Sequence, residues 1–145
     1  MGKKRIVKKG GEDGGGRASS SRQGNKGGRR KMDSGRLYVE ATYNNTKLSL
    51  TDASGNVVSW SSSGSLGFAG AKKGTPFAAA KVGELLGDRA VVMGVKEVAV
   101  VVSGVGAGRE SSIRAFSTKG IHISSIKDTT PVPHNGPRQP KPRRV

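Results

Sequence analysis

The chain has 145 residues, of which 32% are hydrophobic, and its 26 Lys and Arg against 10 Asp and Glu give a formal net charge of +16. This length predicts one small domain with a compact core, and the charge favours a polyanionic partner, nucleic acid before any other. The chain has no cysteine, which excludes disulfides, thiolate zinc sites and cysteine nucleophiles, and no apolar run predicts a membrane span or a secretory signal. We therefore expect a soluble cytoplasmic protein with no membrane partner.

The charge is concentrated at the two ends of the chain. Residues 1–36 hold twelve basic and three acidic residues and ten of the 23 glycines, which predicts a basic extension that is disordered when free. Residues 37–130 hold ten basic and seven acidic residues and contain the periodic apolar residues of a folded domain. Residues 131–145 hold four basic residues, no acid and five of the six prolines, which predicts an extended tail. A single charge run is usually a solvated end, but two of them around a nearly neutral domain favour RNA or DNA.

Three strands that form an antiparallel meander are predicted first. Apolar and polar residues alternate along them, with the period of a half-buried strand. The Asn44-Asn45 pair and residues 52–56 are turn sequences that separate the strands. Strand by strand, the alternating apolar residues are Leu37, Val39, Ala41 and Tyr43, then Leu48 and Leu50, then Val58 and Trp60.

Two helices and two further strands follow. Thr75 before Pro76 predicts the start of a helix. The Thr75 hydroxyl can accept hydrogen bonds from the free amides of the first turn, and proline loses no hydrogen bond at the first helical position. Gly94 can end this helix. The β-branched residues 97–102 predict a strand covered on both faces. A shorter helix over about residues 110–119 and a last strand over residues 121–126 complete the order βββαβαβ, an α/β fold with a mixed five-stranded sheet. Apolar residues at helical spacing in the first helix are Ala78, Val82, Leu85, Leu86 and Met93.

Two glycine-rich loops are candidate phosphate-binding segments. Residues 64–75 lack the Gly-Lys-Ser/Thr ending of a nucleotide-binding loop, which excludes NTP binding there, but Lys72 and Lys73 precede a helix whose free amides point back at the loop. Residues 104–110 join a strand to a helix, with the third glycine one residue too early for a dinucleotide fingerprint. The structural alternative is a flexible connection for the first loop and a tight strand-to-helix turn for the second. The two lysines of the first loop, with Arg109 and Arg114 after the second, favour RNA binding instead, with both loops facing one RNA surface.

The ionisable residues do not predict an enzyme. His122 and His134 lack further ligands at metal-site spacing, so we expect no metal and no cofactor. The enzymatic alternative is a two-metal nuclease, which needs several carboxylates at one point. The available acids, predicted at strand ends or on a solvent face, are Glu40, Asp52, Glu97 and Asp128.

Four motifs occur in an order and spacing that identify one family. They are Asn44-Asn45-Thr46, Gly74-Thr75-Pro76-Phe77-Ala78-Ala79, Gly106-Ala107-Gly108-Arg109-Glu110-Ser111 and Pro131-Val132-Pro133-His134-Asn135-Gly136. By them the sequence resembles bacterial-type small-subunit ribosomal protein eleven over residues 36–145. The resemblance implies a ribonuclease-H-like topology without catalysis.

The same resemblance implies the partners and the site. The chain would bridge helices of the small-subunit ribosomal RNA on the platform, near the messenger RNA path and beside small-subunit ribosomal proteins seven and eighteen, as a cytoplasmic ribosomal protein that forms no homo-oligomer. Residues 1–36 carry no motif that can be transferred from the family, and we expect them to make only nonspecific contacts with this RNA. The predicted RNA-binding residues are Asn44, Asn45, Lys72, Lys73, Gly74, Thr75, Gly106, Gly108, Arg109, Arg114, His134, Asn135, Gly136, Arg138, Lys141, Arg143 and Arg144.

Two hypotheses remain beside this one. Glycine after Asn135 leaves the attacking amide unhindered, and the family is associated with isoaspartate here, so Asn135 is expected to convert partly or fully; the alternative is an unmodified turn asparagine. A free regulatory RNA or DNA chaperone would share the charge but would not need the motifs of the folded domain.

Overall fold

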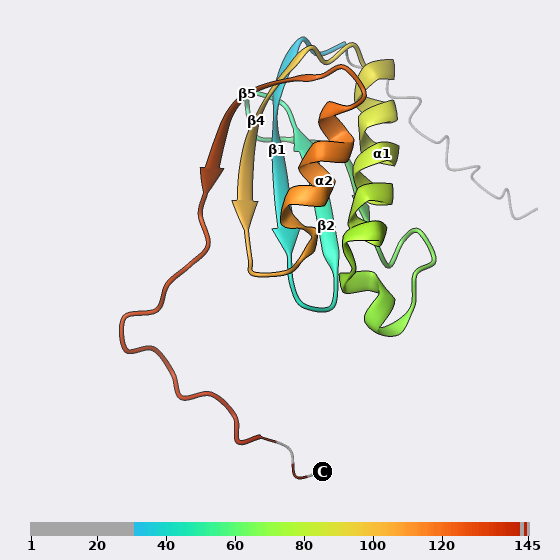
Figure 1. Ribbon diagram of the computed structural model, residues 1–145. Coiled ribbons are helices and arrows are strands. Elements are labelled where there is room, and N and C mark those ends of the chain that lie inside the picture. The colour runs from blue at the N-terminus through green and yellow to red at the C-terminus, as the bar shows by residue number, and fades with distance from the viewer. Residues whose placement is uncertain (1–30, 143, 145) are drawn as a thin grey trace, which may run out of the picture.

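A mixed sheet with helices on one face makes up the folded part of the computed structural model, which describes residues 31–142 and 144 (Figure 1). The elements are β1 (Ser34–Ala41), β2 (Thr46–Thr51), β3 (Val57–Ser62), the 3₁₀ helix η1 (Gly70–Gly74), α1 (Pro76–Val92), β4 (Glu97–Ser103), α2 (Gly108–Ser117) and β5 (His122–Asp128). The predicted α/β class and the order βββαβαβ are confirmed, and η1 is an addition that the sequence pattern did not predict.

The two predicted extensions are described to different degrees. Residues 1–30 of the N-terminal extension lie outside the described residues, and β1 begins at Ser34, so residues 34–36 belong to the sheet. At the other end, residues 131–142 and 144 are exposed and contain no helix or strand. The prolines of this tail account for that, because proline lacks the amide that helices and central strands require.

The sheet has the order β3-β2-β1-β4-β5. The predicted meander is confirmed, since β2 pairs antiparallel with both β1 and β3, whereas β4 pairs parallel with both β1 and β5. Strands β1, β4 and β5 therefore run in one direction and end at the same edge, which we call the carboxyl edge. The ribonuclease-H-like topology implied by the resemblance stays a prediction.

The helix predicted after Thr75 forms as expected. The Thr75 hydroxyl accepts a hydrogen bond from the amide of Ala78 at 3.3 Å, and Pro76 occupies the first turn of α1. After Met93, Gly94 adopts φ +82°, a left-handed conformation that glycine takes without steric cost. Both ends of α1 thus follow from local chemistry.

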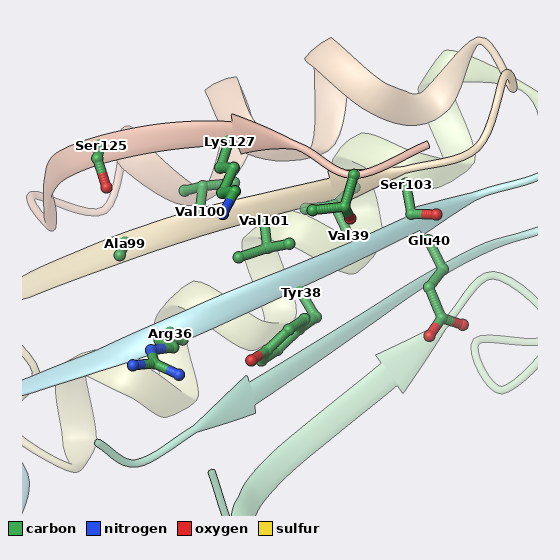
Figure 2. A pocket seen from close by; sticks show the side chains of 11 residues that line it. Arg36, Tyr38, Val39, Glu40, Ala99, Val100, Val101, Ser103, Ser125 and Lys127 are labelled. Atoms are coloured by element: carbon green, nitrogen blue, oxygen red, sulfur yellow. The ribbon is translucent and has the colours of Figure 1, made fainter. Parts of the chain in front are cut away.

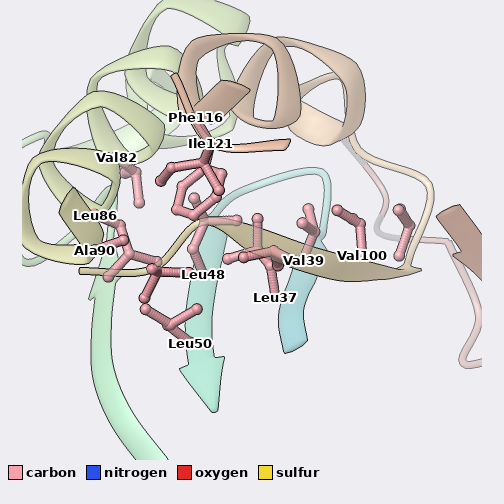
Figure 3. Packing of buried hydrophobic residues seen from close by; sticks show 13 residues of the cluster. Leu37, Val39, Leu48, Leu50, Val82, Leu86, Ala90, Val100, Phe116 and Ile121 are labelled. Carbon is pink, nitrogen blue, oxygen red and sulfur yellow. The ribbon is translucent and has the colours of Figure 1, made fainter. Parts of the chain in front are cut away.

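Both helices pack on the same face of the sheet and on each other (Figure 1). Their apolar side chains close over those of β1, β2 and β4, with Phe116 of α2 fully buried at the centre (Figure 3). The prediction that β4 is covered on both faces is wrong. Val98, Val100 and Val102 are buried under the helices, whereas Ala99, Val101 and Ser103 remain partly exposed on the opposite face.

The two helices approach closely at Gly83 of α1. A Cβ atom there would overlap the carbonyl oxygen of Ser112 and lie 3.1 Å from the Cβ of Ala115. Further along, Lys119 forms an ion pair with Asp88 of α1 at 2.8 Å. The helix pair is therefore held by a backbone contact at one point and by opposite charges at another.

Gly83→Ala is expected to destabilise the protein by about 1–3 kcal/mol, because the new methyl group meets backbone that cannot move without separating α1 from α2. In an unconstrained helix the same change would stabilise by roughly 1 kcal/mol. Gly87→Ala is the matched control, since its Cβ would meet the flexible Lys119 side chain, with Cγ at 2.7 Å. Urea unfolding monitored by circular dichroism measures both, and an unchanged or raised stability of Gly83→Ala would contradict the close contact.

Candidate nucleic-acid interface

All the described loops for which RNA contacts were predicted lie at the carboxyl edge of the sheet. The β1–β2 turn (residues 42–45), the loop from β3 to α1 (residues 63–75), the loop from β4 to α2 (residues 104–107) and the tail after β5 all leave the sheet there (Figure 1). The reason is strand direction, because β1, β3, β4 and β5 all end at this edge and β2 starts there.

The β1–β2 turn is a closed hydrogen-bonded unit. The amide of Thr42 donates to the carbonyl of Asn45 at 2.9 Å, and the amide of Asn45 donates to the hydroxyl of Thr42 at 3.1 Å. Regular pairing ends at Ala41 opposite Thr46, so Tyr43 lies in the turn with 78% of its surface exposed. The expectation that Tyr43 continues the buried alternation of β1 is wrong. It is an exposed aromatic side chain beside Asn44, and its position next to a turn pair was the signal that could have revealed it.

Two glycines hold this turn from opposite sides. A Cβ at Gly74 would overlap the carbonyl oxygen of Tyr43, and a Cβ at Gly106 would overlap the carbonyl oxygen of Thr42. The amide of Gly106 also donates to the carbonyl of Ala41 at 2.8 Å. These contacts bring the β1–β2 turn and both glycine-rich loops into one surface, with Gly106 itself buried by the protein.

Lys72 and Lys73 supply charge to this surface from η1. Lys72 is exposed and Lys73 is half-buried, and neither takes part in an ion pair within the described residues. Thr75 differs, because its hydroxyl donates to the carbonyl of Lys72 at 2.7 Å and caps α1. The two lysines are therefore available to a polyanion, while Thr75 fixes the loop that carries them.

Both helices begin at the carboxyl edge. The amino end of a helix carries partial positive charge and amides without intrahelical partners. At α2 no side chain caps the first turn after Ala107, and Gly108, which begins the helix, is buried where a Cβ would overlap the Thr46 hydroxyl. The amino ends of α1 and α2 add to the positive potential of the two lysines.

Arg109 is half-buried and is held by residues at the start of the tail. Its guanidinium donates to the carboxylate of Asp128, to the carbonyl of Gly104 and, at 3.1 Å, to the hydroxyl of Thr130. Hydrogen bonds from the Thr130 hydroxyl and amide, followed by the one from Arg109, lower the pKa of Asp128 to about 2. The structure thus gives Arg109 a positioning role, since it joins the loop after β4 to the point where the tail begins.

The remaining predicted residues lie apart from this cluster. Arg114 projects from the later part of α2 and pairs with Glu110 at 2.8 Å. Asn135 has φ +55°, a left-handed conformation that asparagine tolerates better than most residues. The described tail residues, all exposed, are His134, Asn135, Gly136, Arg138, Lys141 and Arg144, and Arg143 lies outside the described residues.

The four acids weighed for a nuclease are dispersed. Asp52 lies in the β2–β3 turn, where hydrogen bonds from the Asn56 side chain and amide lower its pKa, and Glu97 begins β4 at the edge opposite Asp128. Within residues 31–142 and 144, no three His, Asp or Glu side chains come together where they could hold a metal ion.

In the same range no helix is long and apolar enough to cross a membrane.

The fold and the carboxyl edge together define a small basic α/β protein with cationic side chains on the loops of this edge and along its exposed tail. Comparison with known proteins agrees with this class and narrows it. A family model described as ribosomal protein S11 matches residues 35–144. The chain belongs to this family.

Two relatives show how far the likeness extends, and each is named small ribosomal subunit protein uS11. The protein of Acaryochloris marina is 50% identical over 124 residues, which cover 86% of this chain and 95% of the relative. The protein of Gloeobacter violaceus is 52% identical over 117 residues, which cover 81% of this chain and 90% of the relative. The family predicted from the four motifs is confirmed.

Asp128→Asn is expected to loosen the start of the tail, because a neutral amide holds the Arg109 guanidinium and the Thr130 amide less strongly than a carboxylate. Amide hydrogen exchange at Thr130 should be faster in the variant at pH 6. The pKa of Asp128 is lowered, so the carboxylate's contribution is complete above pH 3.8 and is lost as the pH falls through about 2. The difference between the two proteins should therefore shrink as the pH falls through about 2 and vanish only below that pH. Asp33→Asn, at the opposite end of the sheet, is the control, and equal exchange at pH 6 would contradict the role of Asp128.

Proposed function

We propose that this chain is a structural constituent of the small ribosomal subunit that binds and bridges helices of the small-subunit ribosomal RNA. Membership of the ribosomal protein S11 family supports this role, and both relatives carry the name of a small ribosomal subunit protein. Its place of action would be the ribosome in the cytoplasm, with ribosomal RNA and other ribosomal proteins as partners. It acts by holding RNA in place and catalyses no reaction.

One observation carries the RNA-binding part of the proposal: the β1–β2 turn, both glycine-rich loops and the start of the basic tail meet at the carboxyl edge. Separate segments on one rigid edge can contact more than one RNA helix at once. Glycines let the backbone come close to phosphate, and an exposed Tyr43 offers a ring on which a base can stack. The edge would therefore supply shape recognition, while the lysines and the tail supply phosphate neutralisation.

The finer placement is also part of the proposal. The chain would sit on the platform of the small subunit near the messenger RNA path, beside small-subunit ribosomal proteins seven and eighteen, without forming a homo-oligomer. Of the residues predicted to touch RNA, Lys72, Lys73 and Asn44 have side chains free to do so at the carboxyl edge, and Arg138, Lys141 and Arg144 are exposed along the tail. Gly74, Gly106, Gly108, Thr75 and Arg109 would act mainly by shaping the loops.

Sedimentation of a cell lysate through a sucrose gradient in high salt tests the proposal. The protein, followed by mass spectrometry, is expected to travel with the small ribosomal subunit at one copy per particle. Recovery at the top of the gradient, or spread over unrelated RNAs, would reject the ribosomal role and favour a free RNA chaperone.

The double variant Lys72→Ala/Lys73→Ala tests the carboxyl edge. If each lysine neutralises one phosphate, the slope of log binding constant against log salt should fall in magnitude by about 1.4–1.8 for small-subunit ribosomal RNA. Lys31→Ala/Lys96→Ala removes the same charge at the other end of the sheet and should change the slope less. Equal slopes for the two double variants would argue against a special role for the edge.

We also propose that Asn135 converts to isoaspartate. The following residue is glycine, and both residues lie exposed in the tail, where neighbouring structure does not block the reaction. Electron-transfer fragmentation of the protein from isolated subunits should show the isoaspartate signature at position 135, and a Gly136→Ala protein should show much less. Ordinary asparagine alone at this position would refute the conversion.

A further inference from the structure

The sheet has a second face that no described segment covers. Both helices lie on one side, and in Figure 1 the tail leaves the edge of the sheet without crossing the other. Ala99 and Val101 of β4 are half-buried there, although β4 is a central strand. We call this side of the sheet the open face.

Strand register places two aromatic side chains on the open face. Tyr38 of β1 is the partner of Ser49 in β2, and Ser49 is the partner of Trp60 in β3. The neighbours of Trp60 along the strand, Ser59 and Ser61, pair with the core residues Leu50 and Leu48, so Trp60 points away from the core. Trp60 is 56% exposed, which is unusual for the largest apolar side chain.

The same row continues across the sheet to a cation. Val101 of β4 is the partner of Tyr38, and Lys127 of β5 is the partner of Val101. The side chains of β1 and β5 form the walls of a groove of about 710 Å³, whose floor is β4 with the small residues Ala99 and Ser103 (Figure 2). Figure 2 shows Arg36 and Tyr38 projecting side by side from β1.

The open face carries net positive charge. Arg36 and Lys127 take part in no ion pair among the described residues, whereas Glu40 is paired with Lys47 at 3.6 Å. Glu97 alternates with Ala99 and Val101 on the same face and lies near Arg36, so the basic residues exceed the acidic ones here by one. The remaining groove side chains are mostly serine, threonine and small apolar residues. Tyrosine and tryptophan are also common in protein interfaces, so the unpaired Arg36 and Lys127 beside the rings are what favour an anionic partner with rings that can stack, which is nucleic acid.

We propose that the open face binds unpaired nucleotides of RNA. Bases would stack on Tyr38 and Trp60, which stand two strands apart, about 10 Å, and phosphates would be neutralised by Arg36 and Lys127. The hydroxyl of Ser49, which lies between the rings, can bond to base edges and 2′-hydroxyl groups. Because the ligand is RNA, the inference rests on the proposed function, but it concerns a surface distinct from the carboxyl edge.

Trp60 is the single tryptophan of the chain, so its fluorescence reports on the open face alone. The full-length protein is titrated with a short single-stranded RNA of mixed sequence that carries a terminal dye. Dye anisotropy measures total binding, and Trp60 emission measures stacking. A hairpin RNA and small-subunit ribosomal RNA are titrated in parallel.

We expect the single strand to quench Trp60 and the hairpin stem to quench it much less. Tyr38→Ala should weaken the binding that causes quenching by about 5-fold to 150-fold, the range for loss of one stacked base, while Tyr38→Phe should retain it. Arg36→Gln/Lys127→Gln should also weaken it. Lys31→Gln/Lys96→Gln removes equal charge at the end of the sheet opposite the carboxyl edge, outside both proposed RNA surfaces, and should leave the quenching intact; circular dichroism establishes that each variant is folded.

Other outcomes overturn the inference in distinguishable ways. The inference about the open face is rejected if small-subunit ribosomal RNA binds without quenching Trp60. It is also rejected if neither Tyr38→Ala nor Arg36→Gln/Lys127→Gln reduces the quenching. In both cases the proposed function still stands. Failure of every RNA to bind rejects both the inference and the proposed function. A photoreactive residue at position 49, between the two rings, adds a test in assembled subunits: crosslinks to RNA support the inference, and crosslinks to protein alone overturn it.

Discussion

The contact between the β1–β2 turn and two glycines is the constraint on which the carboxyl edge depends. Gly74 and Gly106 touch the carbonyl oxygens of Tyr43 and Thr42, so the chain at both positions has no room for a side chain. Backbone packed against backbone leaves little freedom, and three segments distant in sequence become one rigid surface. Lys72, Asn44 and the start of the tail take their positions from this arrangement.

The cations of the folded domain divide into two groups with different roles. Arg109, Arg114 and Lys119 are paired with Asp128, Glu110 and Asp88, and the pairs of Arg109 and Lys119 join elements of the fold to one another. Lys72, Lys73, Arg36 and Lys127 lack such partners within the described residues. All of these residues carry the same formal charge. A bound polyanion gains more free energy from the unpaired group, because those side chains do not have to break an ion pair within the protein first.

The one-sided packing of the helices gives the molecule two different surfaces. The covered face buries the apolar side chains of β1, β2 and β4 against Phe116 and the residues of α1. The open face keeps an exposed tryptophan, a tyrosine and the free cation Lys127 in one row, with Arg36 two residues away along β1. In the proposed function, RNA can contact the open face as well as the carboxyl edge, because both belong to the same sheet and neither surface covers the other.

Local patterns in the sequence determined most of the elements. Alternation located β1 and β2, Thr75 and Pro76 located the start of α1, Gly94 located its end, and four motifs identified the family. These signals act within a few residues, so they can be read along the chain. The tertiary structure alone decided that β4 is covered on one face, that Tyr43 is exposed, and that Arg109 is held by Asp128. Those outcomes depend on which distant segment packs against each residue, and a β-branched strand or an arginine carries no local record of its eventual partner.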